Sequence, residues 1–395
     1  MSTPTSMPTD QEAPPKLDLD AFITQALGGT PAPLHSYFES FRTLYNKRLW
    51  HQLTLKLFDF INEPASAPYQ VEVFTRFVRD FESRINSLRL VELAAKVARQ
   101  IDNPQSHLLL LSSLLTRIRE AENPSKEAEA HLLTTIAYSK LVFGDLDGAR
   151  KDMDSSWEIL ETLSGVERGV SGTFYQMAAD YYKAKADYAP YYKNALLYLA
   201  CIDVATDLTA EERLLRAHDL GIAALLGETI YNFGELLMHP ILDALDNTDY
   251  DWIKRLLFTF NEGNIGKFEA IAPLFPKEPI LQDSYPFLRQ KICLMALIEV
   301  VFRRGAGERT IPFQTVAAET RLPTNEVEHL LMKALSLNLI KGSLDQVSGV
   351  AHITWVQPRV LSREQIGHLA SRLQGWMDRL ASVEGRIAPE VSATA

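Results

Sequence analysis

The sequence is poor in cysteine and has no long apolar run, and both shortages narrow the classes of protein it can encode. Cys201 and Cys293 are its only cysteines among 395 residues. Two thiols so far apart in the chain cannot build a zinc ribbon or a disulfide framework, so we expect two buried apolar side chains in a reducing compartment. The apolar segments 108–115 and 292–302 are well short of the ~18 residues that a membrane-spanning helix needs. We therefore expect no membrane partner.

Positive charge is also in short supply. Fifty Asp and Glu residues outnumber forty Lys and Arg residues, which gives a net charge of −10. Proteins that bind nucleic acid mainly through electrostatics need the opposite sign, so we expect no nucleic-acid partner. The first residues offer neither the basic nor the apolar segment of an export signal, so secretion is not expected either.

Helical periodicity is what the chain has in abundance. Residues 1–15 are rich in proline and have little to bury, which predicts a mobile tail. From residue 18 to 302, apolar residues recur at spacings of three and four between short breaks, and no strand-like alternation is found. Two predicted helical hairpins, 127–163 and 174–202, follow one another with a repeat close to that of two-helix solenoids. The pattern predicts a curved stack of helix pairs.

The pattern changes after residue 286. Helices are predicted over 287–303, 315–320 and 324–338, the last with Thr324 as its N-cap. Two strands, 340–347 and 350–356, follow around Ser348-Gly349, read as a two-residue turn. Three helices and a hairpin are the order of a winged helix. Its third helix carries Glu326 and Glu328, so we expect a protein contact at the exposed edge of the hairpin rather than DNA binding.

The last predicted helix has the most regular pattern of all. Its apolar residues alternate between spacings of three and four, which is the 3.5-residue period of a coiled-coil seam. The seam consists of Ile366, Leu369, Leu373, Trp376, Leu380, Val383 and Ile387. Gly367, Gly375 and Gly385 each weaken a helix by about 1 kcal/mol relative to alanine, so we expect this helix to depend on partner helices.

A search for catalytic, cofactor and metal motifs yields no expected site. The stretch 263–267 lacks the glycine spacing of a phosphate loop and is predicted to be a turn between helices, and 305–307 a loop. Glu235 and His239 lie one helical turn apart without a third ligand, so His239 is expected to contact the carbonyls that end its helix. Asp145 and Asp147 are expected to cap a helix. Tyrosines between 181 and 198 are expected to pack between helices rather than to stack on RNA bases.

Four stretches resemble the 26S proteasome non-ATPase regulatory subunit 13 family: LWHQLTL (49–55), YYKNAL (191–196), FGELLMHP (233–240) and HITWVQPRVL (352–361). The likeness extends from about residue 37 to 377. It implies a mainly α fold, with a right-handed helical-repeat (TPR-like) solenoid followed by a winged-helix PCI module and a C-terminal bundling helix. The implied domains are a disordered tail (1–17), the solenoid (18–285), the winged helix (286–358) and the C-terminal helix with its tail (359–395).

The same resemblance implies a function. It indicates a non-catalytic structural subunit of the proteasome regulatory particle lid, without cofactors, which scaffolds lid assembly for ubiquitin-dependent degradation in the cytoplasm and nucleus. The implied partners are other lid PCI subunits, the MPN subunits and the proteasome ubiquitin receptor, and no stable homo-oligomer is expected. The winged-helix edge would contact its neighbour through Ile340, Leu344, Val350, Ile353 and Trp355. The helix bundle would use Ile366, Leu369, Leu373, Trp376, Leu380 and Val383.

Three alternatives stay open at the level of sequence. One is a PCI scaffold of another complex, the signalosome or a translation initiation factor. Another is a winged-helix regulator that binds nucleic acid, for which the unit 287–357 offers only eight basic residues against six acidic ones. An enzyme that uses Glu235 or His239 is the third.

Overall fold

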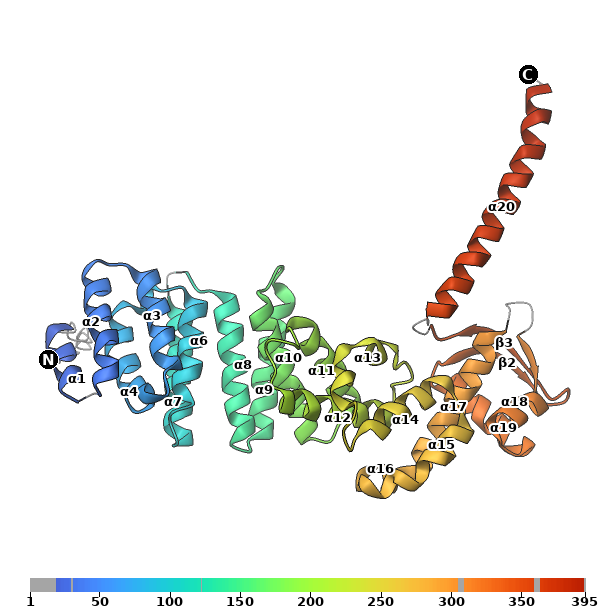
Figure 1. Ribbon diagram of the computed structural model, residues 1–395, viewed down its shortest axis with the longest axis horizontal. Coiled ribbons are helices and arrows are strands. Elements are labelled where there is room, and N and C mark those ends of the chain that lie inside the picture. Colours follow the sequence, from blue (N-terminus) through green and yellow to red (C-terminus); the bar gives the residue numbers. More distant parts are fainter. Residues whose placement is uncertain (1–18, 30, 122, 305–308, 359–362, 394–395) are drawn as a thin grey trace, which may run out of the picture. The chain divides into compact units, whose positions relative to one another are not determined.

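The computed structural model describes residues 19–29, 31–121, 123–304, 309–358 and 363–393. In this part of the chain, helices follow one another until a small sheet near the C-terminal end (Figure 1). The mainly α fold is therefore confirmed. The chain forms two compact units, residues 1–185 and 186–395. The predicted tail 1–15 and loop 305–307 lie outside the described residues, and the predicted domain boundaries stay predictions.

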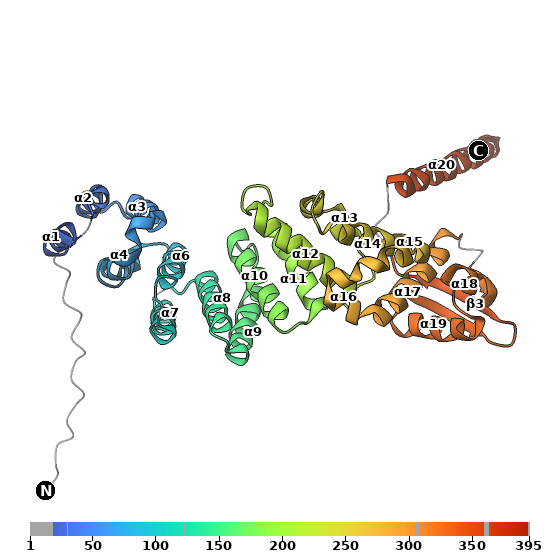
Figure 2. The ribbon, with the colours of Figure 1, turned by 60° about the horizontal axis from the view of Figure 1, so that its bottom comes forward.

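The first unit is a stack of helices in which α3, α6, α8 and α10 are successive neighbours (Figure 2). Its centre is aromatic: Phe41, Phe60 and Phe77 are almost completely buried, with ring centroids 5.7 Å apart in each contacting pair. Asparagine, serine and aspartate side chains start several of these helices by accepting a backbone N–H of the first turn. The elements are α1 (Leu19–Gly29), α2 (Ala32–Asn46), α3 (Trp50–Asn62), η1 (Pro64–Ser66), α4 (Ala67–Glu72), η2 (Val73–Val78), α5 (Arg79–Phe81), η3 (Glu82–Arg84), α6 (Ser87–Ala98), α7 (Pro104–Glu120), α8 (Lys126–Val142), α9 (Leu146–Thr162) and α10 (Arg168–Ala184).

The first predicted hairpin is confirmed as α8 and α9. Asp145 caps α9 by accepting the N–H of Gly148 at 2.9 Å, as expected for this turn. Because Asp145 is the N-cap residue, α9 starts at the next residue, Leu146. Hydroxyl groups of Thr134 and Ser156, 2.9 Å apart and buried, join the two helices.

The second unit continues with helices and ends in the sheet and a long helix. Its elements are α11 (Tyr188–Cys201), α12 (Ala210–Leu226), α13 (Gly234–Met238), η4 (Pro240–Leu245), α14 (Asp251–Glu262), α15 (Ile265–Ile271), η5 (Ala272–Lys277), α16 (Pro279–Asp283), α17 (Tyr285–Arg303), β1 (Thr310–Pro312), α18 (Phe313–Thr320), α19 (Thr324–Ser336), β2 (Ile340–Asp345), β3 (Val350–Val356) and α20 (Arg363–Ala393). Gly263 ends α14 with a left-handed backbone and Asn264 caps α15, which confirms the predicted turn between helices.

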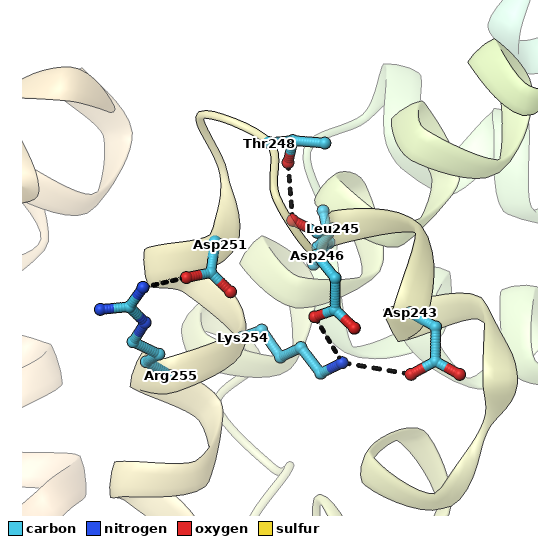
Figure 3. Close-up of polar contacts among 7 residues, drawn as sticks. All are labelled: Asp243, Leu245, Asp246, Thr248, Asp251, Lys254 and Arg255. Atoms are coloured by element: carbon cyan, nitrogen blue, oxygen red, sulfur yellow. Dashed lines mark hydrogen bonds and ion pairs between the residues drawn. The ribbon is translucent and has the colours of Figure 1, made fainter.

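A small polar network fixes the junction between η4 and α14 (Figure 3). The ammonium of Lys254 donates to Asp243 at 3.1 Å and to Asp246 at 2.7 Å. Arg255 pairs with Asp251 one turn earlier on α14. Lys254 is largely shielded from solvent, and it links α14 to Asp243 of η4 and to Asp246 at the end of η4.

The winged-helix order is confirmed, with α17, α18 and α19 followed by the hairpin of β2 and β3. A third strand, β1, was not predicted; it pairs antiparallel with β3, so the strand order is β1-β3-β2. Two local predictions are wrong. Asp345 accepts the N–H groups of Val347 and Ser348, so β2 ends at Asp345 and a four-residue loop replaces the two-residue turn. Pro323 rather than Thr324 is the N-cap residue, because helical geometry begins at Thr324.

Candidate partner interfaces

The sheet of the winged helix has one long free edge, strand β2, because β3 is central. Among the residues predicted for this interface, Ile340 and Ile353 are buried in the unit itself, so a contact at Ile340 would use its main chain. Leu344 and Val350 are half-buried. The N–H of Ile353 is already bonded to the carbonyl of Arg309. Trp355 is 38% exposed, with the ammonium of Lys341 lying 5.0 Å from its ring.

The seam of α20 is exposed from Ile366 to Val383, and the side chain of the predicted seam residue Ile387 lies outside the described residues. Its six apolar side chains from Ile366 to Val383 are between 45% and 64% exposed. Apolar side chains in a continuous stripe at the surface are typical of an interaction site. A β-carbon at Gly367 or Gly375 would meet no atom within 4 Å, so neither glycine is required by packing in this chain. The seam thus has the spacing and exposure of one helix of a coiled coil without its partner helix. Its role in binding stays a prediction.

His239, considered above as a metal ligand or catalytic residue, forms a hydrogen bond within the local fold. Nδ1 of His239 accepts the N–H of Ile241 at 3.2 Å, so the expected contact with helix-end carbonyls is wrong. Burial lowers the pKa of His239, which keeps the ring neutral. In the part of the chain that the structure describes, no three His, Cys, Asp or Glu side chains are grouped to hold a metal ion. None of the described helices has the length and apolar character of a membrane-spanning segment.

The predictions for cysteine and tyrosine are confirmed in part. Cys293 is buried, and burial raises the pKa of its thiol to about 11. Cys201 is only half-buried. Tyr191, Tyr192 and Tyr198 are buried, in agreement with packing between helices.

Comparison with known proteins decides the family. The model of the PSD13 N-terminal repeats matches residues 37–257, and that of the PCI domain matches residues 272–355. A probable 26S proteasome regulatory subunit rpn9 of Schizosaccharomyces pombe is 38% identical over 367 residues, which cover 93% of this chain and 95% of the relative. The 26S proteasome non-ATPase regulatory subunit 13 homolog B of Arabidopsis thaliana is 37% identical over 91% of this chain and 96% of the relative. The chain belongs to the 26S proteasome non-ATPase regulatory subunit 13 family.

Family membership confirms the resemblance seen in the four sequence stretches. It also accounts for the two parts of the fold, because the repeat match covers α2 to α14 and the PCI match reaches from η5 to β3. The eukaryotic translation initiation factor 3 subunit M of Aspergillus clavatus is a weaker match, 24% identical over 73% of this chain and 62% of the relative. The family therefore supports the proteasome interpretation over the initiation-factor alternative.

Proposed function

We propose that this protein is a non-catalytic structural subunit of the proteasome regulatory particle lid and that it scaffolds lid assembly for ubiquitin-dependent protein degradation. The observation that carries the proposal is the extent of one alignment. It covers 93% of the length of this chain and 95% of the length of a relative named as a proteasome regulatory subunit. The family models place the repeats and the winged helix within the matched part of the chain.

Two surfaces support specific partner contacts within that assembly. The main chain of β2 and the ring of Trp355 suit a side-by-side contact with the winged helix of another lid PCI subunit. The seam of α20 suits a helix bundle with MPN subunits, since its stripe has the heptad spacing of a bundle helix. The helical repeats would extend toward the ubiquitin receptor. The protein would act in the cytoplasm and nucleus, where the proteasome works.

Nucleic-acid binding has less support. The start of α19, which would enter a DNA groove in a winged-helix regulator, exposes Glu326 and half-exposes Glu328. Carboxylates at that position repel phosphates, so α19 favours a protein partner.

Reconstitution of the lid tests the proposal. Lid subunits are expressed together with this chain or without it, and the products are separated on native gels. We expect the complete lid only when the chain is present, with an incomplete intermediate in its absence. A complete lid that forms equally well without the chain would show that it is not a structural subunit.

A further inference from the structure

The first compact unit contains a groove that the interfaces above do not use. Its volume is about 850 Å³, and α3, α6, α8 and α10 line it. Each helix presents one face: on α8, the lining residues His131, Thr135, Tyr138 and Val142 follow at intervals of three or four. At 1.5 Å per residue, this face of α8 is about 16 Å long, or three helical turns.

The rim of the groove is apolar and its floor is polar but satisfied. Four large rim side chains are between 38% and 64% exposed: Leu55, Tyr138, Val142 and Phe143. On the floor, Nε2 of His107 lies 2.8 Å from Oγ of Ser139, and Nδ1 of His131 lies 3.0 Å from Oγ1 of Thr173. Burial lowers the pKa of both histidines, so the floor is neutral. The exposed apolar rim is therefore the part available for a ligand.

Charge is unequally distributed around this groove. Two of its carboxylates are already paired, Glu92 with Arg89 at 2.7 Å and Asp59 with Lys56 at 2.9 Å. Among the described residues, Lys96 and Arg99 of the groove wall have no carboxylate partner.

The contacts of Lys96 are with neutral groups. The ammonium of Lys96 donates to the amide oxygen of Asn62 at 2.9 Å and lies 5.3 Å from the ring of Phe58. Asp102 is the one lining carboxylate without an ion pair in the described part of the chain. The unpaired charges leave an excess of positive charge beside an apolar rim.

We infer that this groove docks an amphipathic helix of another protein, with apolar residues against Leu55, Tyr138 and Val142 and acidic residues facing Lys96 and Arg99. A helix that lies in an apolar groove uses anchors at intervals of three and four, which match the spacing of the wall. The inference does not depend on the lid assignment.

The occupants that this chain itself could supply fit less well. The seam helix of a second copy carries Arg372 and Arg379 directly beside Leu373 and Leu380, so it would bring cations toward Lys96 and Arg99. Residues 1–15 contain four prolines, which disfavour a helix in that segment. Opposite charge and helical form together select a separate, acidic partner helix.

A pair of synthetic peptides tests the inference on the full chain alone. Both are stapled helices of about fifteen residues with one leucine stripe, and the residues beside the stripe are glutamate in one peptide and lysine in the other. By fluorescence anisotropy at low salt, we expect the glutamate peptide to bind roughly tenfold more tightly, and the double variant Lys96→Glu, Arg99→Glu to reverse the preference. Equal affinities, or no binding of either peptide, would overturn the inference.

A matched pair of surface variants places the binding in the groove. Val142→Asp is expected to abolish binding of the glutamate peptide, whereas Leu109→Asp on α7 should leave it unchanged, because Leu109 is 70% exposed and lies outside the groove. Both positions are exposed, so both variants should keep the melting temperature of the wild type. If Leu109→Asp weakened binding as much as Val142→Asp, the peptide would not be bound in the groove and the inference would fail.

Discussion

Lys291 is a buried side chain whose ammonium group donates hydrogen bonds to the end of a helix, where water would otherwise donate them. It is 1% exposed and donates to the carbonyls of Ala224, Leu225 and Gly227, at 2.8, 2.9 and 2.7 Å. These carbonyls end α12 and have no partner within that helix. Burial lowers the pKa of Lys291 to about 7, whereas only the ammonium form can donate to all three acceptors. Lys291 thus connects α17 of the winged helix to the end of α12.

Replacement of Lys291 should therefore be costly. We expect Lys291→Met to lower the free energy of unfolding by about 3 kcal/mol, because it leaves the buried carbonyls of Ala224 and Leu225 without a donor. The carbonyl of Gly227 still accepts the N–H of Ile230. Chemical denaturation measures this, with Arg289→Met, an exposed change on the same helix, as the control. Equal effects of the two substitutions would show that the bonds of Lys291 add no net stability.

His218 makes stability depend on pH. It lies between two carboxylates, at 3.4 Å from Asp219 and 3.0 Å from Glu278, and their hydrogen bonds raise the pKa of the ring above 6.5. A raised folded-state pKa means that protonated His218 stabilises the fold below about pH 6.5 and that this stabilisation is lost as the pH rises through the folded-state pKa.

Substitution of His218 should accordingly matter most in acid. We expect His218→Asn to lower the melting temperature by about 2–4 °C more at about pH 5.5 than at about pH 8. Thermal unfolding of both proteins across this pH range provides the measurement. A difference that does not change with pH would contradict the assignment.

Among the described elements, α20 has an exposed apolar face that we expect a partner to cover. Leu373→Asp and Trp376→Asp should prevent incorporation into the lid and leave the melting temperature of the chain unchanged, because both side chains are exposed in the chain itself. Ser371→Asp, on the same helix but off the seam, is the control. Co-purification with lid subunits measures incorporation, and normal incorporation of the seam variants would exclude the seam as the contact.

The sheet supplies the second element-scale prediction. Trp355→Ala should weaken the contact with a neighbouring winged helix by about tenfold, since an exposed aromatic ring is a typical hot spot. Val347→Ala in the hairpin loop, where the side chain is fully exposed, should have no effect. Crosslinking between adjacent lid subunits compares the two variants. If the crosslink survives Trp355→Ala, this face does not make the contact.

Local sequence patterns predicted the helices and the hairpin of the winged helix. The features that they did not predict depend on contacts between residues far apart in the sequence. Strand β1 has three residues and ends in Pro312, so no alternation marks it; only its pairing with β3, about forty residues later, makes it a strand. The partners of Lys291 are 64 to 67 residues away in the sequence.

The sequence of α8 contains a local indication of the groove. Tyr138 and Val142 are four residues apart and lie outside the apolar face that α8 buries in the core. This second apolar face on one helix is the pattern from which the groove could have been predicted. The seam of α20 could be predicted as a helix face from spacing alone, but its partner could not, because nothing within this chain covers its described residues.

At the scale of the whole molecule, the chain combines helical repeats, a winged helix and a terminal seam, and we expect each to offer a surface to another protein. The family models match the repeats and the winged helix, so we expect the surfaces of both to act in the same assembly. A scaffold of this kind contributes binding free energy from several separate surfaces, and the loss of one surface should weaken assembly without unfolding the chain.

Native mass spectrometry of the complex that carries this chain tests whether the chain is a structural subunit of the lid. The chain is tagged at its N-terminus, which is outside the residues of the winged-helix sheet and of the seam in the sequence, and is purified from cells of its own source. We expect one copy of the chain in a complex with the other lid subunits, including the MPN pair. A monomer, or a complex with nucleic acid and no proteasome subunit, would contradict it.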